Sequence, residues 1–401
     1  TMKKLYTTVF LLLVMYTTAF SQSFDYNFTM PKIDHARDLG MGSAYLTDTT
    51  TYFAFLTNPA SLGLTGDKTL FPIINTRLAG PLGIIPEAID LFQTENPDIM
   101  GFAGKTLGES KGINMAFNTA GPLTFGAIRK GFGWGVFNET YTSFDMPSLL
   151  SATVYGGNES FLRIGYGYPI NLPFPVTIAV GLSAEAVNRV EGFYRLGAFQ
   201  LLSTLMGGEI SLASLAMPVY TSFGYGLDAG ITIKAFKLVS VSFVWDDFFY
   251  GIHTQKADQA YKIIEDPSNF SSYMQTDLKQ TTIGSSKKMS AGIGVDIPLA
   301  EISNNFVSSW IVMVDCNDLV SAFSNDPTKR NPALEFSAGT EIVFFKTIIL
   351  RFGVDEMYPA AGIGIRLGAF NIDASIYGQE LGYEPGARPQ LNTAFSIGFY
   401  K

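Results

Sequence analysis

Residues 391–400 read LNTAFSIGFY, a stretch in which apolar side chains alternate with small or polar ones. Successive side chains of a β-strand point to opposite faces, so this spacing predicts a strand with one apolar face and one face of small residues. The two faces carry Leu391, Thr393, Phe395, Ile397 and Phe399 on one side and Asn392, Ala394, Ser396 and Gly398 on the other.

The same period-two alternation recurs along the chain after residue 110, most clearly at 219–234, 289–297 and 361–367. A soluble β-sandwich also alternates, but its outer face meets water and usually carries many Lys and Glu side chains. Here the polar face is dominated by Gly, Ser, Ala and Asn. Small polar residues are typical of a crowded barrel lumen, with the apolar face turned toward lipid.

The composition also favours a membrane protein. Of the 401 residues, 47% are hydrophobic and 15% are charged, compared with about 25% charged residues in typical soluble proteins. A membrane helix needs ~20 apolar residues, and only residues 5–20 are densely apolar over a long run. A multi-span helical bundle is therefore excluded. The remaining structure that pairs every backbone group within lipid is a closed β-barrel.

We therefore predict an all-β transmembrane barrel of about fourteen antiparallel strands over residues 69–401. Residues 112–129 count as one strand only if it bends at Gly121–Pro122, because proline cannot donate to the ladder. Short inner turns and longer outer loops then alternate, as in bacterial outer-membrane barrels. The strands are expected at 69–77, 112–129, 132–144, 159–169, 176–190, 217–234, 238–250, 288–297, 305–316, 333–344, 346–356, 360–367, 370–379 and 391–400.

Both ends of the chain agree with this location. Residues 1–21 are predicted to be a signal peptide, because Lys3 and Lys4 precede an apolar run that ends in the cleavage-site pattern Ala19–Phe20–Ser21. The predicted location is the bacterial outer membrane. At the other end, Phe399 and Tyr400 agree with recognition of an aromatic C-terminal strand by the barrel insertion machinery, although Lys401 comes last.

Residues 22–68 are not strand-like, yet they are too apolar for a free tail, and we expect them to form an N-terminal hatch. Two blocks stand out within them: residues 35–45 read HARDLGMGSAY, and residues 57–62 read TNPASL. Gly40 and Gly42 allow close backbone packing, and Asn58–Pro59 favours a turn.

These two blocks resemble the N-terminal hatch of the FadL family of outer-membrane transporters, whose members read roughly ARALGMGGAY and then NPAGL. The resemblance implies a fourteen-stranded barrel whose lumen is plugged by the N-terminal segment. It also implies passive transport of long-chain fatty acids or other hydrophobic compounds. By motif match, the hatch residues are Gly40, Gly42, Asn58, Pro59 and Ala60.

The chain departs from this pattern at Ser43, which replaces a family glycine, and at Ser61–Leu62, which replaces Gly-Leu. The acidic pair usual between the blocks is reduced to Asp48, within a run of threonines. The same signature occurs in PorV-like and PorQ-like barrels, which bind partners in type IX secretion or surface assembly. A secretion-system partner is therefore the alternative function.

A hydrophobic-substrate channel needs an apolar external surface that captures its ligand, and two predicted outer loops could supply it. Residues 84–93 read as a short amphipathic helix that begins at Pro86. Loop 191–216 is apolar at helical spacing, which usually marks a binding surface. The predicted ligand-binding residues are Ile85, Ile89, Phe92, Phe199, Leu202, Leu205, Met206 and Leu212.

The channel also needs an exit that avoids a water-filled lumen. A kink in a wall strand at Gly121 and Pro122 would open a gap between strands, through which an apolar molecule could diffuse sideways into the outer-membrane lipid. This wall kink is a hypothesis from the sequence.

Other chemistry finds little support, and no cofactor, metal or catalytic site is expected. Cys316 is the single cysteine, and His35 and His253 lie far apart without ligand spacing. The net charge of −8 and the scattered basic residues argue against nucleic acid. Asp246–Asp247 and Asp355–Glu356 are interpreted as rim charges at outer strand ends, because neighbouring strand residues face opposite sides. Residues 251–287 are expected to form a polar outer loop.

Overall fold

In the computed structural model, placement is described for residues 34–80, 101, 113–148, 151–197, 218–257, 269, 272, 275–285, 288–300, 306–324 and 329–401. None of the helices in these ranges is long and apolar enough to cross a membrane. The proposed signal peptide, residues 1–21, lies outside the described residues.

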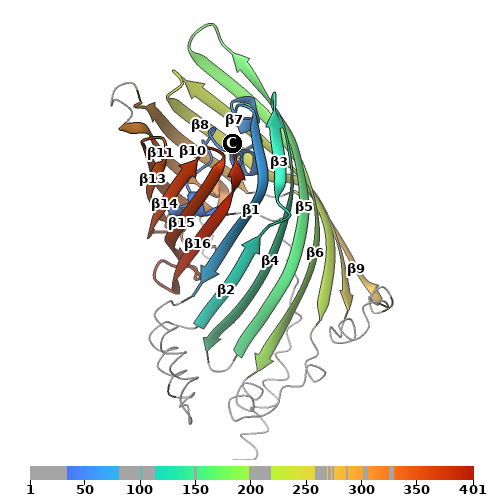
Figure 1. Ribbon diagram of the computed structural model, residues 1–401. Helices are drawn as coiled ribbons and strands as arrows, with labels where there is room; N and C mark the ends of the chain where they lie inside the picture. The colour runs from blue at the N-terminus through green and yellow to red at the C-terminus, as the bar shows by residue number, and fades with distance from the viewer. Residues whose placement is uncertain are drawn as a thin grey trace, which may run out of the picture.

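Sixteen strands form one antiparallel sheet that closes on itself (Figure 1). The ring closes because β1 pairs with β16 and β8 pairs with β10. The strands are β1 (Lys68–Ala79), β2 (Ile113–Ala120), β3 (Phe125–Arg129), β4 (Phe132–Ser148), β5 (Ser151–Asn171), β6 (Val176–Gly197), β7 (Val219–Ala235), β8 (Val239–Ala257), β9 (Gln275–Gly284), β10 (Met289–Pro298), β11 (Val307–Cys316), β12 (Phe336–Phe344), β13 (Ile348–Asp355), β14 (Tyr358–Leu367), β15 (Phe370–Glu380) and β16 (Pro389–Tyr400).

Two wall positions are each shared by two strands. Strands β2 and β3 both lie between β1 and β4, one above the other, and the break between them falls at the predicted bend. Strands β9 and β10 pair one after the other with the outer and inner halves of β8. When each shared position is counted once, the wall has fourteen positions, which confirms the predicted barrel.

The alternation predicted from the sequence determines which side chains face inward. On β16, Leu391, Phe395 and Phe399 are 43–49% exposed on the outer surface, whereas Asn392 and Ser396 are at most 1% exposed. Strands β6, β7, β10 and β14 likewise expose Leu182, Phe223, Ile293 and Ile363. An apolar outer surface around a polar interior is the arrangement of a barrel that faces lipid.

The wall is taller on one side than the sequence predicts. Strands β5 and β6 have 21 and 22 residues, whereas β13 and β14 have 8 and 10. The prediction of an outer loop at 145–158 is therefore wrong, because β4 and β5 pair through most of it. Residues 191–197 belong to β6, and the expected polar loop 251–287 contains the end of β8 and all of β9. Cross-strand pairing extends these strands through polar, Gly-rich sequence whose alternation is weak.

Asp246 and Asp247 are also placed differently from the prediction. They lie within β8, beside a register shift at Leu227/Ala229 of β7, rather than at an outer strand end. Asp355 and Glu356 do lie where β13 turns toward β14.

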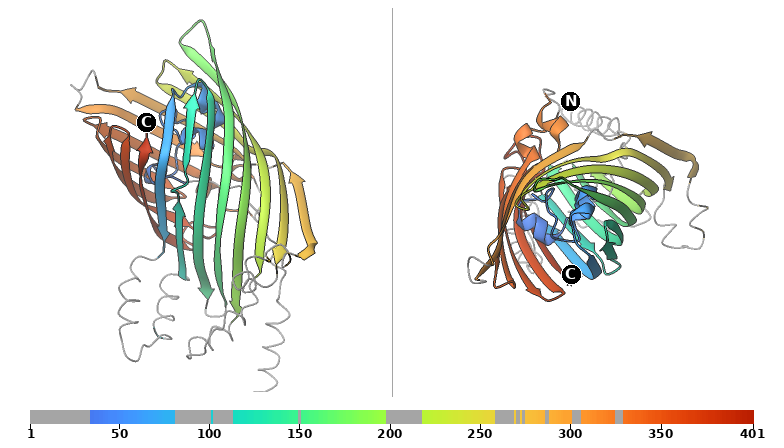
Figure 2. Two further views of the ribbon diagram at one scale, coloured as in Figure 1. Left: turned by 45° about the vertical axis from the view of Figure 1, so that its right-hand side comes forward. Right: turned by 90° about the horizontal axis from the view of Figure 1, so that it is seen from above.

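The segment before β1 lies inside the ring of strands (Figure 2). It contains α2 (Ala36–Gly40), α3 (Ala54–Thr57) and the 3-10 turn η1 (Pro59–Gly63), and most of its residues are buried. Two further short elements, α9 (Leu319–Ala322) and η4 (Pro332–Glu335), connect β11 to β12. We call residues 34–67 the inner segment.

Candidate functional site: the inner segment and the adjacent wall

The first sequence block packs its glycines against the wall. A Cβ on Gly40 would lie 3.0 Å from Cα of Gly362 on β14. Gly42 has φ +62°, and a Cβ there would lie 2.5 Å from the backbone nitrogen of Val354 on β13. Positive φ and this close approach both require glycine at position 42. Ser43, the departure from the family pattern, also has positive φ, at 58°.

The second block is held through Asn58. Its side-chain oxygen accepts a hydrogen bond from the Ala60 backbone N–H at 2.9 Å and so caps η1. Its side-chain nitrogen donates to the backbone oxygen of Leu46 and to Oγ1 of Thr232 on β7, both at 2.9 Å. Asn58 therefore joins both blocks of the inner segment to the wall.

Pro59 and Ala60 fit against glycines of the wall. A Cβ on Gly181 of β6 would lie 2.3 Å from the carbonyl carbon of Pro59, and one on Gly230 of β7 would lie 2.4 Å from Oδ1 of Asn58. The small residues on the inward faces of these strands thus leave the space that the inner segment fills.

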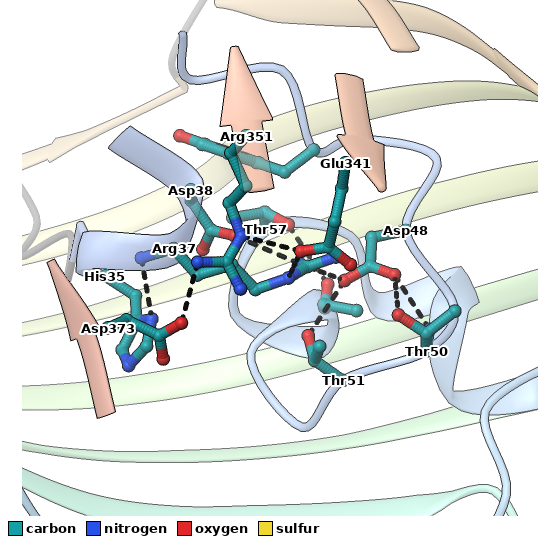
Figure 3. A network of polar contacts seen from close by, with 12 residues as sticks. His35, Arg37, Asp38, Asp48, Thr50, Thr51, Thr57, Glu341, Arg351 and Asp373 are labelled. Carbon is teal, nitrogen blue, oxygen red and sulfur yellow. Dashed lines mark hydrogen bonds and ion pairs between the residues drawn. The ribbon is translucent and has the colours of Figure 1, made fainter. Parts of the chain in front are cut away.

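A buried network of ion pairs connects the inner segment to three wall strands (Figure 3). The Arg37 guanidinium contacts Glu341 of β12 at 2.8 and 3.2 Å and Asp48 at 2.8 Å. Arg351 of β13 contacts the same Glu341 carboxylate and Asp373 of β15, each at 2.7 Å. These side chains are at most 3% exposed, so little water competes for the contacts.

Asp48 anchors the threonine run. It accepts hydrogen bonds from the backbone N–H and the hydroxyl of Thr50, at 2.8 and 2.6 Å, and from the hydroxyl of Thr51, at 2.8 Å. Burial alone would raise the pKa of this carboxyl, but Arg37 and these donors outweigh burial and lower it. Asp48 therefore stays ionised, and its contribution to docking is lost only on strong acidification.

Asp38 behaves in the opposite way. Burial raises its pKa from 3.8 to about 7, and the attraction of Arg37, at 3.2 Å, only partly opposes this. The docked segment thus holds a proton that a released segment would give up between pH 3.8 and about 7. This carboxyl consequently weakens docking as the pH rises through that window.

His35 opposes Asp38 over much of the same range. It is fully buried, stacks on Phe53 with ring centroids 4.3 Å apart, and leaves Nε2 without a hydrogen-bond partner. Burial lowers its pKa from 6.5 to about 4, so the docked imidazole is neutral. Docking therefore strengthens, as far as His35 is concerned, when the pH rises from about 4 to 6.5.

Beside the polar network, the inner segment forms an apolar cluster with the wall. Tyr52, Phe53, Phe55 and Leu62 pack against inward side chains of five strands. The wall residues of this cluster are Leu70, Ile73, Ile128, Phe137, Phe161, Val187 and Tyr400.

The break between β2 and β3 adjoins this cluster. Gly121 has φ +96°, its peptide bond to Pro122 is cis, and a Cβ on it would lie 1.9 Å from the Ile73 carbonyl oxygen. The neighbouring Leu123 is 62% exposed on the outer surface, whereas Thr124 is buried. The interruption therefore lies between the apolar outer surface and the apolar cluster inside.

The predicted ligand-binding residues of the two outer loops cannot be placed against this site. Ile85, Ile89, Phe92, Phe199, Leu202, Leu205, Met206 and Leu212 all lie outside the described residues. Within the described ranges, no group of three or more His, Cys, Asp or Glu side chains is arranged to hold a metal ion.

The main partners of Arg37 escaped the sequence reasoning. Glu341 is 304 positions away, and Arg351 and Asp373 lie on inward faces among many polar wall residues. The available signal was a charged residue within an otherwise small inward face, as in Ser337, Gly339 and Glu341 of β12. That signal indicates an internal partner but does not identify it.

No protein-family model matches the chain, and no curated protein matches it. Three solved structures are similar to it. The toluene transporter TodX of Pseudomonas putida is 10% identical, covering 94% of this chain and 99% of its own, with a TM-score of 0.45. A FadL homologue of Pseudomonas aeruginosa is 12% identical, with coverage of 94% and 99% and a TM-score of 0.43. The Ralstonia pickettii toluene transporter TbuX is 12% identical, with coverage of 92% and 98% and a TM-score of 0.42. At these scores the fold assignment stands on the strand pairing of the chain itself.

Proposed function

We propose that this protein is a FadL-like passive transporter of hydrophobic small molecules in the bacterial outer membrane. The apolar outer surface of the closed barrel supports the location. The fit of the two sequence blocks between wall strands supports the likeness to FadL proteins. The substrate classes to test are long-chain fatty acids and monoaromatic hydrocarbons, the latter because two of the similar structures are described as toluene transporters.

A straight path along the barrel axis is unfavourable for such a substrate. The inner segment lies across the lumen and is tied to the wall by the Arg37–Glu341–Arg351 network. Moving it aside would separate buried ion pairs, which costs several kcal/mol for each uncompensated charge. A passive transporter has no energy source to offset that cost.

The wall break at Gly121–Thr124 is the observation that carries the proposal. It is flanked by apolar side chains on both faces, with Ile73 inside and Leu123 outside. An apolar molecule that moved sideways here would exchange one apolar environment for another, so little free energy opposes the step. Capture at the outer loops, around Leu202 and Met206, is the proposed preceding step.

The decisive experiment measures uptake of a labelled long-chain fatty acid and of labelled toluene by cells that carry wild type or the G121A/P122V variant. A Cβ at position 121 cannot coexist with the present bend, and valine restores a backbone donor, so the variant favours a continuous strand. Uptake should fall for both compounds. Gly386→Ala is the matched control, because Gly386 also has positive φ but lies in an open outer turn.

Two further results would separate the alternatives. Full uptake by a folded G121A/P122V barrel would refute the lateral exit. The capture step is tested by Leu202→Asp and Met206→Asp, and unchanged ligand binding by these variants would refute the capture surface. If the folded wild-type protein neither binds nor transports either compound, the PorV-like alternative becomes the better explanation, and co-purification should then identify its partner.

A further inference from the structure

A cavity of about 350 Å³ lies at the inner end of the barrel, the end with the short turns. It is bounded by the threonine run and Tyr52 of the inner segment and by the inner ends of several wall strands. Three cationic residues line it: Lys68 at the start of β1, Arg366 near the end of β14, and Lys401 after β16. This volume lies at the lower end of the range for small-molecule sites.

Lys68 and Arg366 differ from the buried arginines of the barrel in having no carboxylate partner. Arg37, Arg163 and Arg351 are each paired with at least two carboxylates. Within the described part of the chain, Lys68 and Arg366 form no ion pair, and they are close enough to repel each other. Two like charges that face one cavity attract an anion between them.

Both side chains are directed into the barrel by the strand alternation. Arg366 follows Gly362 and Gly364 on the inward face of β14, whereas Ile363 and Ile365 are exposed outside. Lys68 shares its face with the buried Leu70. The two cations are therefore placed by the fold and are not free surface side chains.

The carboxylates that line the cavity do not neutralise this pair. Glu341 is already bound by Arg37 and Arg351. The cation that acts most strongly on Asp296 is Lys234 of β7, rather than either member of the pair. The remaining lining includes apolar surface from Ile311 and Val343. A positive end beside apolar surface matches a molecule with an anionic head and a hydrocarbon chain.

We propose that this inner cavity binds the oxyanion head group of an amphipathic molecule, with Lys68 and Arg366 as the charge partners and the chain lying along Ile311 and Val343. This inference rests on the proposed transport function and narrows its substrate class from any hydrophobic compound to amphipathic anions. Carboxylate and phosphate head groups share the required chemistry.

The test compares decanoate, decyl phosphate and decanol as competitors of a fluorescent dansyl fatty acid on the full-length protein in a non-ionic detergent. Wild type should bind the better anion about tenfold or more tightly than decanol, because a charge-assisted hydrogen bond contributes about 1.5 kcal/mol or more. Lys68→Gln and Arg366→Gln should each reduce that preference, and the double variant should abolish it. Added salt should weaken anion binding in wild type.

Lys346→Gln is the matched control, because Lys346 is an exposed cation in an inner turn outside the cavity. Far-UV circular dichroism verifies that each variant is folded. An equal preference in wild type and the double variant would overturn the assignment of the cations. Competition by inorganic phosphate as strong as that of decyl phosphate would overturn the amphipathic ligand and indicate a free-anion site.

Uptake distinguishes failure of this inference from failure of the proposed function. Uptake of neutral toluene together with equal binding of decanoate, decyl phosphate and decanol would refute the inner anion site and leave the transporter intact. If no compound is taken up while the head-group preference persists and is lost in the double variant, transport is refuted and the cavity stands as a binding site.

Discussion

Replacing Arg37 with methionine should release the inner segment from the wall. Methionine keeps much of the unbranched length of the side chain but removes the guanidinium, which contacts Asp38, Asp48 and Glu341 at 2.8–3.2 Å. Glu341 would keep Arg351, but Asp48 would lose its cation while remaining ionised and 2% exposed.

The magnitude follows from the burial of these groups. Removing one partner of a buried ion pair typically costs about 3–5 kcal/mol, because the other charge is left uncompensated. Here Arg37 is 1% exposed, so the full range applies. The equilibrium between docked and released segment should shift by about a hundredfold to a few thousandfold.

Thiol labelling measures this opening directly. Ser61 in η1 is 0% exposed, and its hydroxyl has no hydrogen-bond partner, so Ser61→Cys should perturb docking little. In a Cys316→Ser background, labelling of Cys introduced at this position by a water-soluble maleimide reports how often the segment opens. Arg37→Met should raise the labelling rate by the factor above.

The control is Arg388→Met, which removes a rim pair with Asp145 whose side chains are 26% and 34% exposed. Such pairs contribute at most about 1 kcal/mol, so labelling should change by less than about fivefold. A labelling rate in Arg37→Met within twofold of wild type would refute the reasoning that the buried network holds the segment. An equal rise in Arg388→Met would show that loss of any arginine loosens the barrel.

Three further predictions use the same labelling assay. Gly42→Ala should raise labelling strongly, because a Cβ would lie 2.5 Å from the wall backbone, whereas Gly66→Ala, in open space, should not; equal effects would argue against the close packing. Asn58→Ala should weaken docking by about 2 kcal/mol or more through loss of three buried hydrogen bonds, and unchanged labelling would contradict this role. Between pH 4 and 6.5, Asp38→Asn should make the segment dock more tightly as the pH rises, because only the opposing effect of His35 then remains; a pH profile like that of wild type would contradict the assigned pKa shifts.

The strand alternation was the part of the fold that local sequence could reveal. In β16 the apolar residues of 391–400 face outward and the small residues face inward, as the period of two requires. The break at Gly121–Pro122 was readable for a similar reason, because a proline removes one ladder donor wherever it stands. Strand ends were less readable: Tyr155 to Asn158 read as loop but pair with both β4 and β6.

The inner segment was only partly readable. Gly42 and Asn58 carry local signals, a residue type that permits positive φ and a residue type that caps a turn. Neither signal says which wall strand lies opposite. That information depends on the register of β7 and β13, which places Thr232 and Val354 at the contacts.

By itself, the sequence determined the number of wall positions, the face that each strand turns to lipid and the place of the break between β2 and β3. These features arise from backbone geometry and from neighbouring residues along the chain. Only the tertiary structure decided which charges meet, such as Arg37 with Glu341, and which cations, such as Lys68 and Arg366, share a cavity without a partner. The physical reason is that closing the barrel brings together side chains hundreds of positions apart, and their electrostatic energy depends on distance and burial rather than on sequence spacing.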